Sequence, residues 1–260
     1  MLAVLTDRAD DVRSALSTVI DPELDEPITD LGFVRSVGIE DDSVVVHLRL
    51  PTSFCSPNFA YLMASDSKDA LAALPWADRV VVELDDHHDS DIINRGLAAD
   101  AGYKGTFLHE AENDLDELRL TFRRKAHTAA MERCLTRLLR SQPDRPIESL
   151  ATVTLGDLAD DDATASLQLR RDAIGLPRSS GALVMVDHTG AGHAPDDVPM
   201  ALRRARSTRI SIDGNAHFCR GLLATRYPGS EADQAPRPEG TESWGLTFIP
   251  LTELKKEYQS

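Results

Sequence analysis

The stretch FVRSVGIEDDSVVVHLRLPTSFCSP, residues 33–57, decides the fold of the first part of the chain. Apolar residues alternate with polar ones on both sides of an acidic turn at residues 40–43, which predicts a β-hairpin. Pro51 ends this hairpin because proline has no backbone N–H to donate to a neighbouring strand. Pro57 suits the first position of a helix, with Ser56 as its N-cap. The stretch therefore predicts a hairpin, a short loop and a helix in succession.

Helical spacing of apolar residues flanks the hairpin on both sides. A first helix is predicted to begin where Thr6 can cap it and to end before residues 21–23. A second helix is predicted over residues 57–74, and alternation over residues 80–84 then predicts a strand. The expected order of elements is helix, hairpin, helix, strand.

The remainder of the chain gives weaker signals. An acidic stretch with two histidines, residues 85–91, breaks the pattern, and we place a domain boundary near it. Residues 91–110 are predicted to be a connector, and residues 115–138 a long amphipathic helix that ends before Pro143. Short apolar runs then predict strands, and a segment rich in proline, glycine and acidic residues predicts a surface loop. The predicted strands cover residues 151–155, 166–169, 182–186, 208–212 and 244–249, and the loop covers residues 229–241.

These patterns predict an α+β protein with two domains. Residues 1–90 are expected to form a small α/β domain of helix, hairpin, helix and strand. Residues 91–260 are expected to form a second domain of mixed α/β structure. A chain of 260 residues is long enough for both.

The composition excludes several classes of protein. Lys and Arg number 28 against 43 Asp and Glu, and the resulting charge of −15 argues against binding to nucleic acid or to acidic membranes. No apolar run is long enough for a membrane helix. The three cysteines are widely spaced, which is typical of free thiols in a reducing compartment. We therefore predict a soluble cytoplasmic protein.

Cys55 is the residue best placed for chemistry. It lies between the predicted end of a strand and the predicted start of a helix, near unpaired backbone N–H groups and the positive end of the helix dipole. These conditions lower the pKa of a thiol, and a thiolate is both a nucleophile and a metal ligand. The alternative is a small buried cysteine in a loop.

Three short motifs occur in order around this cysteine: Asp21-Pro22-Glu23, then Asp30-Leu31-Gly32, then Thr52 and Cys55 before a helix. In this order they resemble the iron-sulfur cluster assembly domain family, which includes SufT-like and PaaD-like proteins. The resemblance covers roughly residues 8–86. It implies a maturation factor that helps to install iron-sulfur clusters or other metal in client proteins, with Cys55 as the transient ligand of a cluster or of iron.

The other motif residues are candidates for a pocket around Cys55. Asp21 and Glu23 are either ligands or residues that pack a turn. Asp30 can hydrogen-bond its own turn, where Gly32 can supply a positive φ. We expect Asp21, Glu23, Asp30 and Thr52 to shape the Cys55 pocket.

Two further groups contain metal-ligating residues. His217 and Cys219 are two residues apart, and on a strand both side chains would point to one side and could bind one metal; the alternative is an unrelated structural role. In the stretch of residues 85–91, adjacent histidines on a strand would point to opposite faces. We therefore interpret that stretch as a solvated acidic linker.

A fainter resemblance concerns the C-terminal region. Residues 118–126 and the motif Cys219-Arg220-Gly221-Leu222-Leu223 are similar to accessory proteins of actinobacterial multicomponent monooxygenases. This implies a second domain that recognises a client such as a monooxygenase component.

The leading hypothesis is a maturation factor that is not an enzyme. Its expected partners are a client metalloprotein and other assembly factors. A homodimer that shares two Cys55 thiolates is one arrangement, because one cysteine is too few for a cluster. The alternatives are a thiol- or metal-dependent enzyme that uses Cys55 or the pair His217 and Cys219, and an assembly chaperone that binds no metal.

Overall fold

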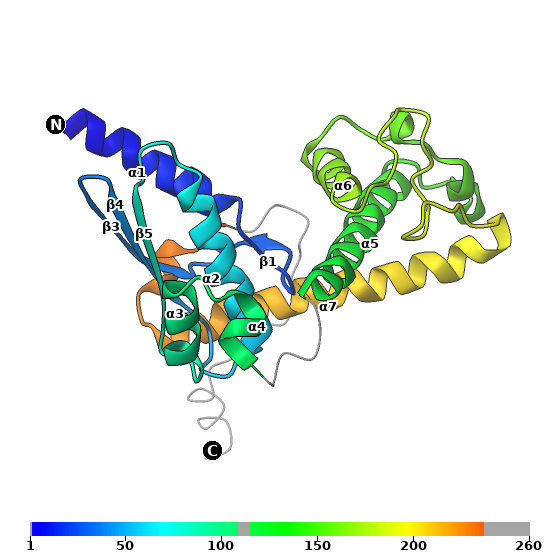
Figure 1. Cartoon of the computed structure of the whole chain (residues 1–260). Coiled ribbons are helices and arrows are strands. Elements are labelled where there is room, and N and C mark those ends of the chain that lie inside the picture. Colours follow the sequence, from blue (N-terminus) through cyan, green and yellow to red (C-terminus); the bar gives the residue numbers. More distant parts are fainter. Residues whose placement is uncertain (1, 109–114, 237–260) are drawn as a thin grey trace, which may run out of the picture.

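The computed structural model describes residues 2–108 and 115–236. These residues form two lobes that are joined by one long helix (Figure 1). The first lobe contains α1 (Leu2–Ser17), β1 (Ile20–Asp21), β2 (Glu26–Pro27), β3 (Val34–Glu40), β4 (Ser43–Arg49), α2 (Pro57–Ala72), β5 (Arg79–Asp85), α3 (Ser90–Ala98) and α4 (Gly102–Phe107). The second contains α5 (Leu115–Ser141), α6 (Asp162–Asp172), the N-terminal half of α7 (Val198–Arg226) and the short 3-10 helices η2 (Ile147–Thr152), η3 (Leu155–Asp157) and η4 (Pro195–Asp197).

A three-stranded sheet in the order β3-β4-β5 forms the centre of the first lobe. The hairpin β3-β4 is antiparallel, whereas β4 and β5 are parallel, with Val46 opposite Val82. Val44, Val46 and Leu48 alternate along β4 and are buried, because α1 and α2 supply the apolar layer that covers this side. The predicted hairpin, second helix and following strand are all confirmed. The first helix begins at Leu2, so Thr6 lies inside it.

The predicted connector at residues 91–110 is wrong, because α3 and α4 occupy most of it. Ile93 and Leu97 of α3 are buried in the first core, and the side chain of Asn94 hydrogen-bonds the backbone of β5 at Leu84. These helices are short and each contains a weakly helix-forming glycine, so local spacing gave little sign of them.

A second core lies between α5, α6 and the N-terminal half of α7, and the long helix predicted from residue 115 is confirmed as α5. Four predicted strands are wrong. Residues 166–169 lie in α6 and residues 208–212 in α7, while residues 151–155 lie mostly in 3-10 turns. Residues 182–186 contribute only isolated bridges, at Leu183 and Val186. Short apolar runs are ambiguous between strand and helix, and here helix packing decides them. The predicted strand at residues 244–249 lies outside the described residues.

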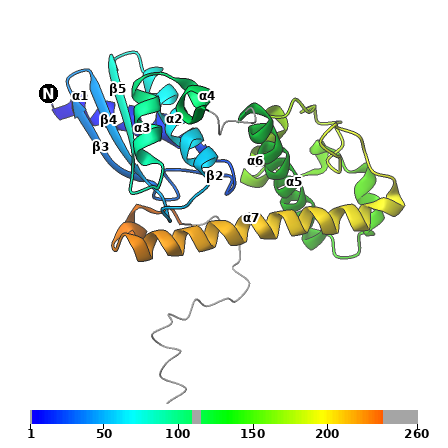
Figure 2. The ribbon, with the colours of Figure 1, turned by 60° about the horizontal axis from the view of Figure 1, so that its bottom comes forward.

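The helix α7 takes part in both cores (Figure 2). Val198 and Leu202 near its start belong to the second core, whereas Ala216 and Leu223 near its end belong to the first. The chain then turns into η5 (Ser230–Asp233), so the start of the predicted loop at residues 229–241 forms a 3-10 helix that packs on the first lobe, while residues 237–241 lie outside the described residues. The chain as a whole is a mixed α and β protein. A domain boundary near residue 90 stays a prediction, and α3, α4 and the end of α7 pack on the first core.

Candidate functional site

The loop that carries Cys55 follows β4 and leads directly into α2. Cys55 is half-buried, and its sulfur lies 3.4 Å from the hydroxyl oxygen of Thr52. Thr52 is fixed in turn, because its hydroxyl accepts a hydrogen bond from the backbone N–H of Phe54 at 3.2 Å. Pro57 stands in the first turn of α2 as predicted, but the Ser56 side chain makes no capping hydrogen bond. The thiol is thus held at the start of a helix with a hydroxyl beside it.

A second loop, after β5, supports the Cys55 loop. His87 is buried, and its Nε2 lies 2.8 Å from the backbone carbonyl oxygen of Cys55. Its Nδ1 accepts a hydrogen bond from the backbone N–H of Asp89, so the proton lies on Nε2, which donates to Cys55. His88 donates its backbone N–H to Ser53, and its ring lies against that of Phe54.

The prediction of a solvated linker at residues 85–91 is therefore wrong. The strands β4 and β5 are parallel, and Arg49 at the end of one lies opposite Asp85 at the end of the other. The loops that follow two such neighbours meet at one edge of the sheet. If the sequence had identified β4 and β5 as parallel neighbours, it would also have predicted that His87 lies close to Cys55.

Asp21 forms the floor of a tight turn. Its Oδ1 accepts hydrogen bonds from the backbone N–H groups of Glu23 and Leu24, both at 2.8 Å. Burial raises the pKa of the Asp21 carboxyl from its ordinary 3.8 to about 7, against the opposing effect of those two hydrogen bonds. Of the two interpretations of Asp21, the turn-packing role is present in the structure.

The remaining motif residues face the end of α7. Glu23 accepts a hydrogen bond from the side chain of Asn215, and the backbone oxygen of Asp30 accepts one from Arg220 at 2.6 Å. Gly32 has the predicted positive φ, at +74°. A Cβ atom at this position would lie 3.3 Å from Leu223. The Asp21-Pro22-Glu23 and Asp30-Leu31-Gly32 motifs therefore form the surface against which the C-terminal half of α7 packs.

The last turns of α7 also reach the Cys55 loop. Arg226 donates to the backbone oxygen of Leu50, at 3.1 Å, and to the hydroxyl of Ser53, at 2.9 Å. Arg220 is buried and pairs with Glu26. Local sequence patterns gave no sign of these contacts, because they join segments more than 170 residues apart.

His217 and Cys219 do not form the predicted pair. Both lie on α7, where residues two positions apart are rotated by about 200° around the helix axis and so point to nearly opposite sides. His217 is exposed, whereas Cys219 is half-buried and packs against the first core, as Cys55 does. Burial raises the pKa of the Cys219 thiol to about 12, and the charges of Asp21, Cys55 and Glu23 act in the same direction. The strand on which this pairing depended is absent, and only Cys219 faces the motif residues.

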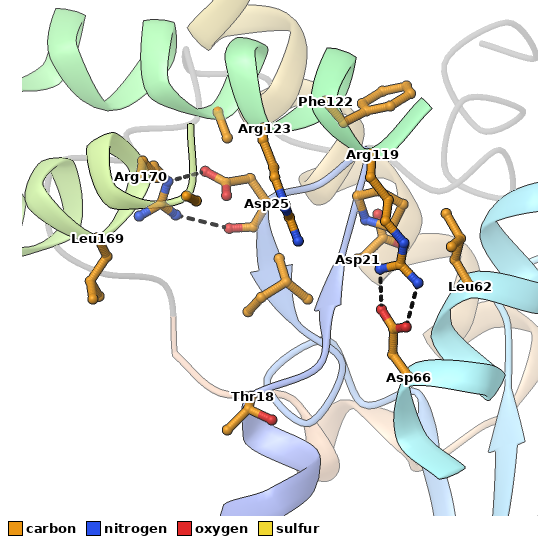
Figure 3. A pocket seen from close by; sticks show the side chains of 14 residues that line it. Thr18, Asp21, Asp25, Leu62, Asp66, Arg119, Phe122, Arg123, Leu169 and Arg170 are labelled. Carbon is orange, nitrogen blue, oxygen red and sulfur yellow. Dashed lines mark hydrogen bonds and ion pairs between the residues drawn. The ribbon is translucent and has the colours of Figure 1, made fainter. Parts of the chain in front are cut away.

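A cavity of about 350 Å³ opens between the lobes beside Asp21 (Figure 3). Two ion pairs flank it: Arg119 of α5 with Asp66 of α2, and Arg170 of α6 with Asp25. Phe122, within the C-terminal resemblance, stacks edge-on against Phe59 at 4.9 Å between ring centroids. These contacts fix the second lobe against the first.

The site does not contain a complete set of metal ligands. Within the described part of the chain, no three His, Cys, Asp or Glu side chains come close enough together to hold a metal ion.

Comparisons with known proteins agree with the motifs. The profile of the family described as "Iron-sulfur cluster assembly protein" matches residues 9–84. A Methanocaldococcus jannaschii protein named "Uncharacterized protein MJ1129" is 34% identical over 89 residues, which are 92% of that protein and 34% of this chain. No solved structure matches the chain significantly. Among residues 2–108 and 115–236, no helix has the length and apolar character needed to cross a membrane.

Proposed function

Because this chain belongs through residues 9–84 to the iron-sulfur cluster assembly protein family, we propose that it is a maturation factor for a client metalloenzyme. In this role it carries an iron-sulfur cluster or iron and passes it on, with the Cys55 thiolate as transient ligand. The observation that carries the proposal is a half-buried thiol at the carboxyl edge of the sheet, in a chain whose described residues offer no complete metal site.

The surroundings of Cys55 suit a thiol that binds and releases. The hydroxyl of Thr52 lies within hydrogen-bonding distance of the sulfur and can donate to a thiolate. His87 hydrogen-bonds the backbone carbonyl of Cys55, so that the loop keeps its shape when the cargo leaves. The chain thus supports the ligand without enclosing it.

An incomplete ligand set favours transfer. Clusters in stable sites are held by four protein ligands, most often cysteines. A cargo held by fewer ligands of the carrier keeps positions at which ligands of the client can bind first. Each new client bond then replaces one carrier bond, and the carrier thiol takes up a proton as it leaves. No oxidation or reduction of the chain is needed for this exchange.

The second lobe is the part proposed to select the client. It lies outside the matched residues 9–84, and the ion pairs of Arg119 and Arg170 hold it beside the first lobe. A client that binds α5, α6 and α7 is therefore brought close to the carrier lobe. The resemblance of residues 118–126 to monooxygenase accessory proteins is the reason to propose a multicomponent monooxygenase as the client.

The test is the metal content of protein purified without oxygen. Iron, zinc and acid-labile sulfide per chain are measured for wild type, Cys55→Ala and a control variant, Cys134→Ala, whose cysteine is buried in the second core. The proposal predicts iron in wild type and in the control, and its loss in Cys55→Ala. Metal retained in Cys55→Ala contradicts it and favours an enzyme with another site. If all three proteins remain free of metal after incubation with iron and sulfide, the chain is a metal-free chaperone.

A further inference from the structure

Cys219 lies on the side of α7 that faces the first lobe. Ala216 precedes it by three residues and Leu223 follows it by four, and both are fully buried in the first core. Residues at these spacings share one face of a helix. Cys219 therefore points toward the first lobe, whereas the neighbouring His217 is exposed.

Two fixed contacts bracket the position of Cys219 along the helix. One turn earlier, Asn215 hydrogen-bonds Glu23 of the Asp21 turn at 3.2 Å. Two turns later, Arg226 hydrogen-bonds Ser53 of the Cys55 loop at 2.9 Å. The helix thus passes from the first motif to the third, and Cys219 lies between those two contacts.

Both thiols lie against the first lobe. Cys55 and Cys219 each pack against the apolar cluster of the first lobe. The charges of Asp21, Cys55 and Glu23 also raise the pKa of the Cys219 thiol. Cys134, the third cysteine, is buried in the other core, where its sulfur donates to the backbone oxygen of Ala163.

We propose that Cys219 is the second thiol ligand of the Cys55 site, so that one chain offers two thiolates to the cargo. This inference rests on the proposed carrier function. The second thiolate comes from α7, outside the matched residues 9–84, and so it is a feature of this longer chain. Two thiolates suit iron and its clusters, because thiolate sulfur is a soft ligand, and the client supplies the remaining ligands.

Binding and release at these thiols need no redox chemistry. Each thiol that binds the metal forms a metal–sulfur bond and releases its proton to solvent. Each sulfur that a client ligand replaces takes up a proton again.

The first test asks whether the two sulfurs can be joined within one chain. The full-length protein is treated at low concentration with dibromobimane, which links two thiols by displacing two bromide ions. The proposal predicts a cross-link between Cys55 and Cys219. Mass spectrometry should show it as the mass of a cross-linked monomer and, after digestion, as a linked pair of peptides. The link should disappear in Cys219→Ser and remain in Cys134→Ser. Attachment at Cys55 alone, without a link to Cys219, overturns the proposal.

The second test uses cobalt(II) as the probe, because cobalt bound to thiolate absorbs through sulfur-to-metal charge transfer. The absorbance per bound cobalt should fall to roughly half in Cys219→Ala, since one of two thiolates is removed. Unchanged absorbance in Cys219→Ala, together with its loss in Cys55→Ala, refutes the role of Cys219 and leaves the carrier function standing. Unchanged absorbance in Cys55→Ala refutes both.

Discussion

His87 donates a hydrogen bond from its imidazole to the backbone carbonyl of Cys55, across 2.8 Å and between two loops that follow parallel strands. The ring is buried and also accepts a hydrogen bond from Asp89, so its orientation is fixed. This contact makes His87 a positioning residue for the thiol. It explains why an acidic, histidine-bearing segment is folded against the sheet edge.

The first prediction concerns that contact. His87→Ala should lower the free energy of unfolding by about 1–3 kcal/mol, because it leaves the partly buried carbonyl of Cys55 without its donor. It should also increase hydrogen exchange in the Cys55 loop, as measured by mass spectrometry. His87→Gln, which can donate from its amide, should restore part of the protection. His188→Ala serves as the control because His188 is exposed and lies in the second lobe, away from the Cys55 loop. Equal exchange in His87→Ala and His188→Ala would remove the positioning role.

The second prediction concerns the packing of α7 against Gly32. Gly32→Ala and Gly175→Ala both place a side chain at positive φ, +74° and +71°, which costs about 1–2 kcal/mol each. At Gly32 the new Cβ also meets Gln234 at 3.1 Å and Leu223 at 3.3 Å, whereas nothing lies within 4 Å at Gly175. Chemical denaturation should therefore show a larger decrease in the free energy of unfolding for Gly32→Ala than for Gly175→Ala. Equal losses would mean that α7 does not rest on this turn in solution.

The third prediction concerns pH. The folded chain holds a proton on Asp21 up to a pH of about 7, whereas the unfolded chain releases it near 3.8. Burial of this carboxyl therefore weakens the fold progressively as pH rises from about 4 to 7. Asp21→Asn keeps the shape and has no charge to bury. Thermal unfolding should show the variant gaining stability over wild type between pH 5 and pH 8, by more than about 1 kcal/mol. A difference that stays constant over this range would contradict the shift.

The fourth prediction concerns the attachment of α7. Arg220→Gln should lower the free energy of unfolding by about 3 kcal/mol, because it leaves Glu26 and the carbonyl of Asp30 without their partner. The exposed Arg204 of the same helix supplies the control, and Arg204→Gln should change stability by less than about 0.5 kcal/mol. Similar losses in the two variants would show that the Arg220 contacts contribute nothing.

Local periodicity was sufficient for the hairpin, α2 and β5 of the first lobe, but not for the short pair β1 and β2. Alternating valines on either side of an acidic turn specify a hairpin, and proline at the start of α2 places Cys55 between strand and helix. The same reasoning failed for the short helix α3, whose burial comes from contacts with β5 and not from a long apolar stripe.

The packing of α7 against the motif residues of the first lobe could not be predicted from local sequence. The buried residues of α7 follow one stripe along the helix. The helix nevertheless has no strong apolar face, because exposed apolar side chains such as Met200, Ile210 and Phe218 lie outside this stripe. The apolar spacing within residues 208–212 therefore suggested a strand. Contacts such as that of Asn215 with Glu23 join segments 192 residues apart and leave no trace in the spacing of either segment.

The most direct test of the carrier function is transfer. Wild-type protein and the Cys55→Ala variant are each incubated with iron and sulfide without oxygen, separated from free ions, and mixed with a cluster-free ferredoxin in the presence of an iron chelator. The proposed function predicts that ferredoxin regains its visible absorbance with wild type and not with Cys55→Ala. Equal recovery with both proteins, or recovery only when the chelator is absent, would contradict the claim that Cys55 carries the cargo.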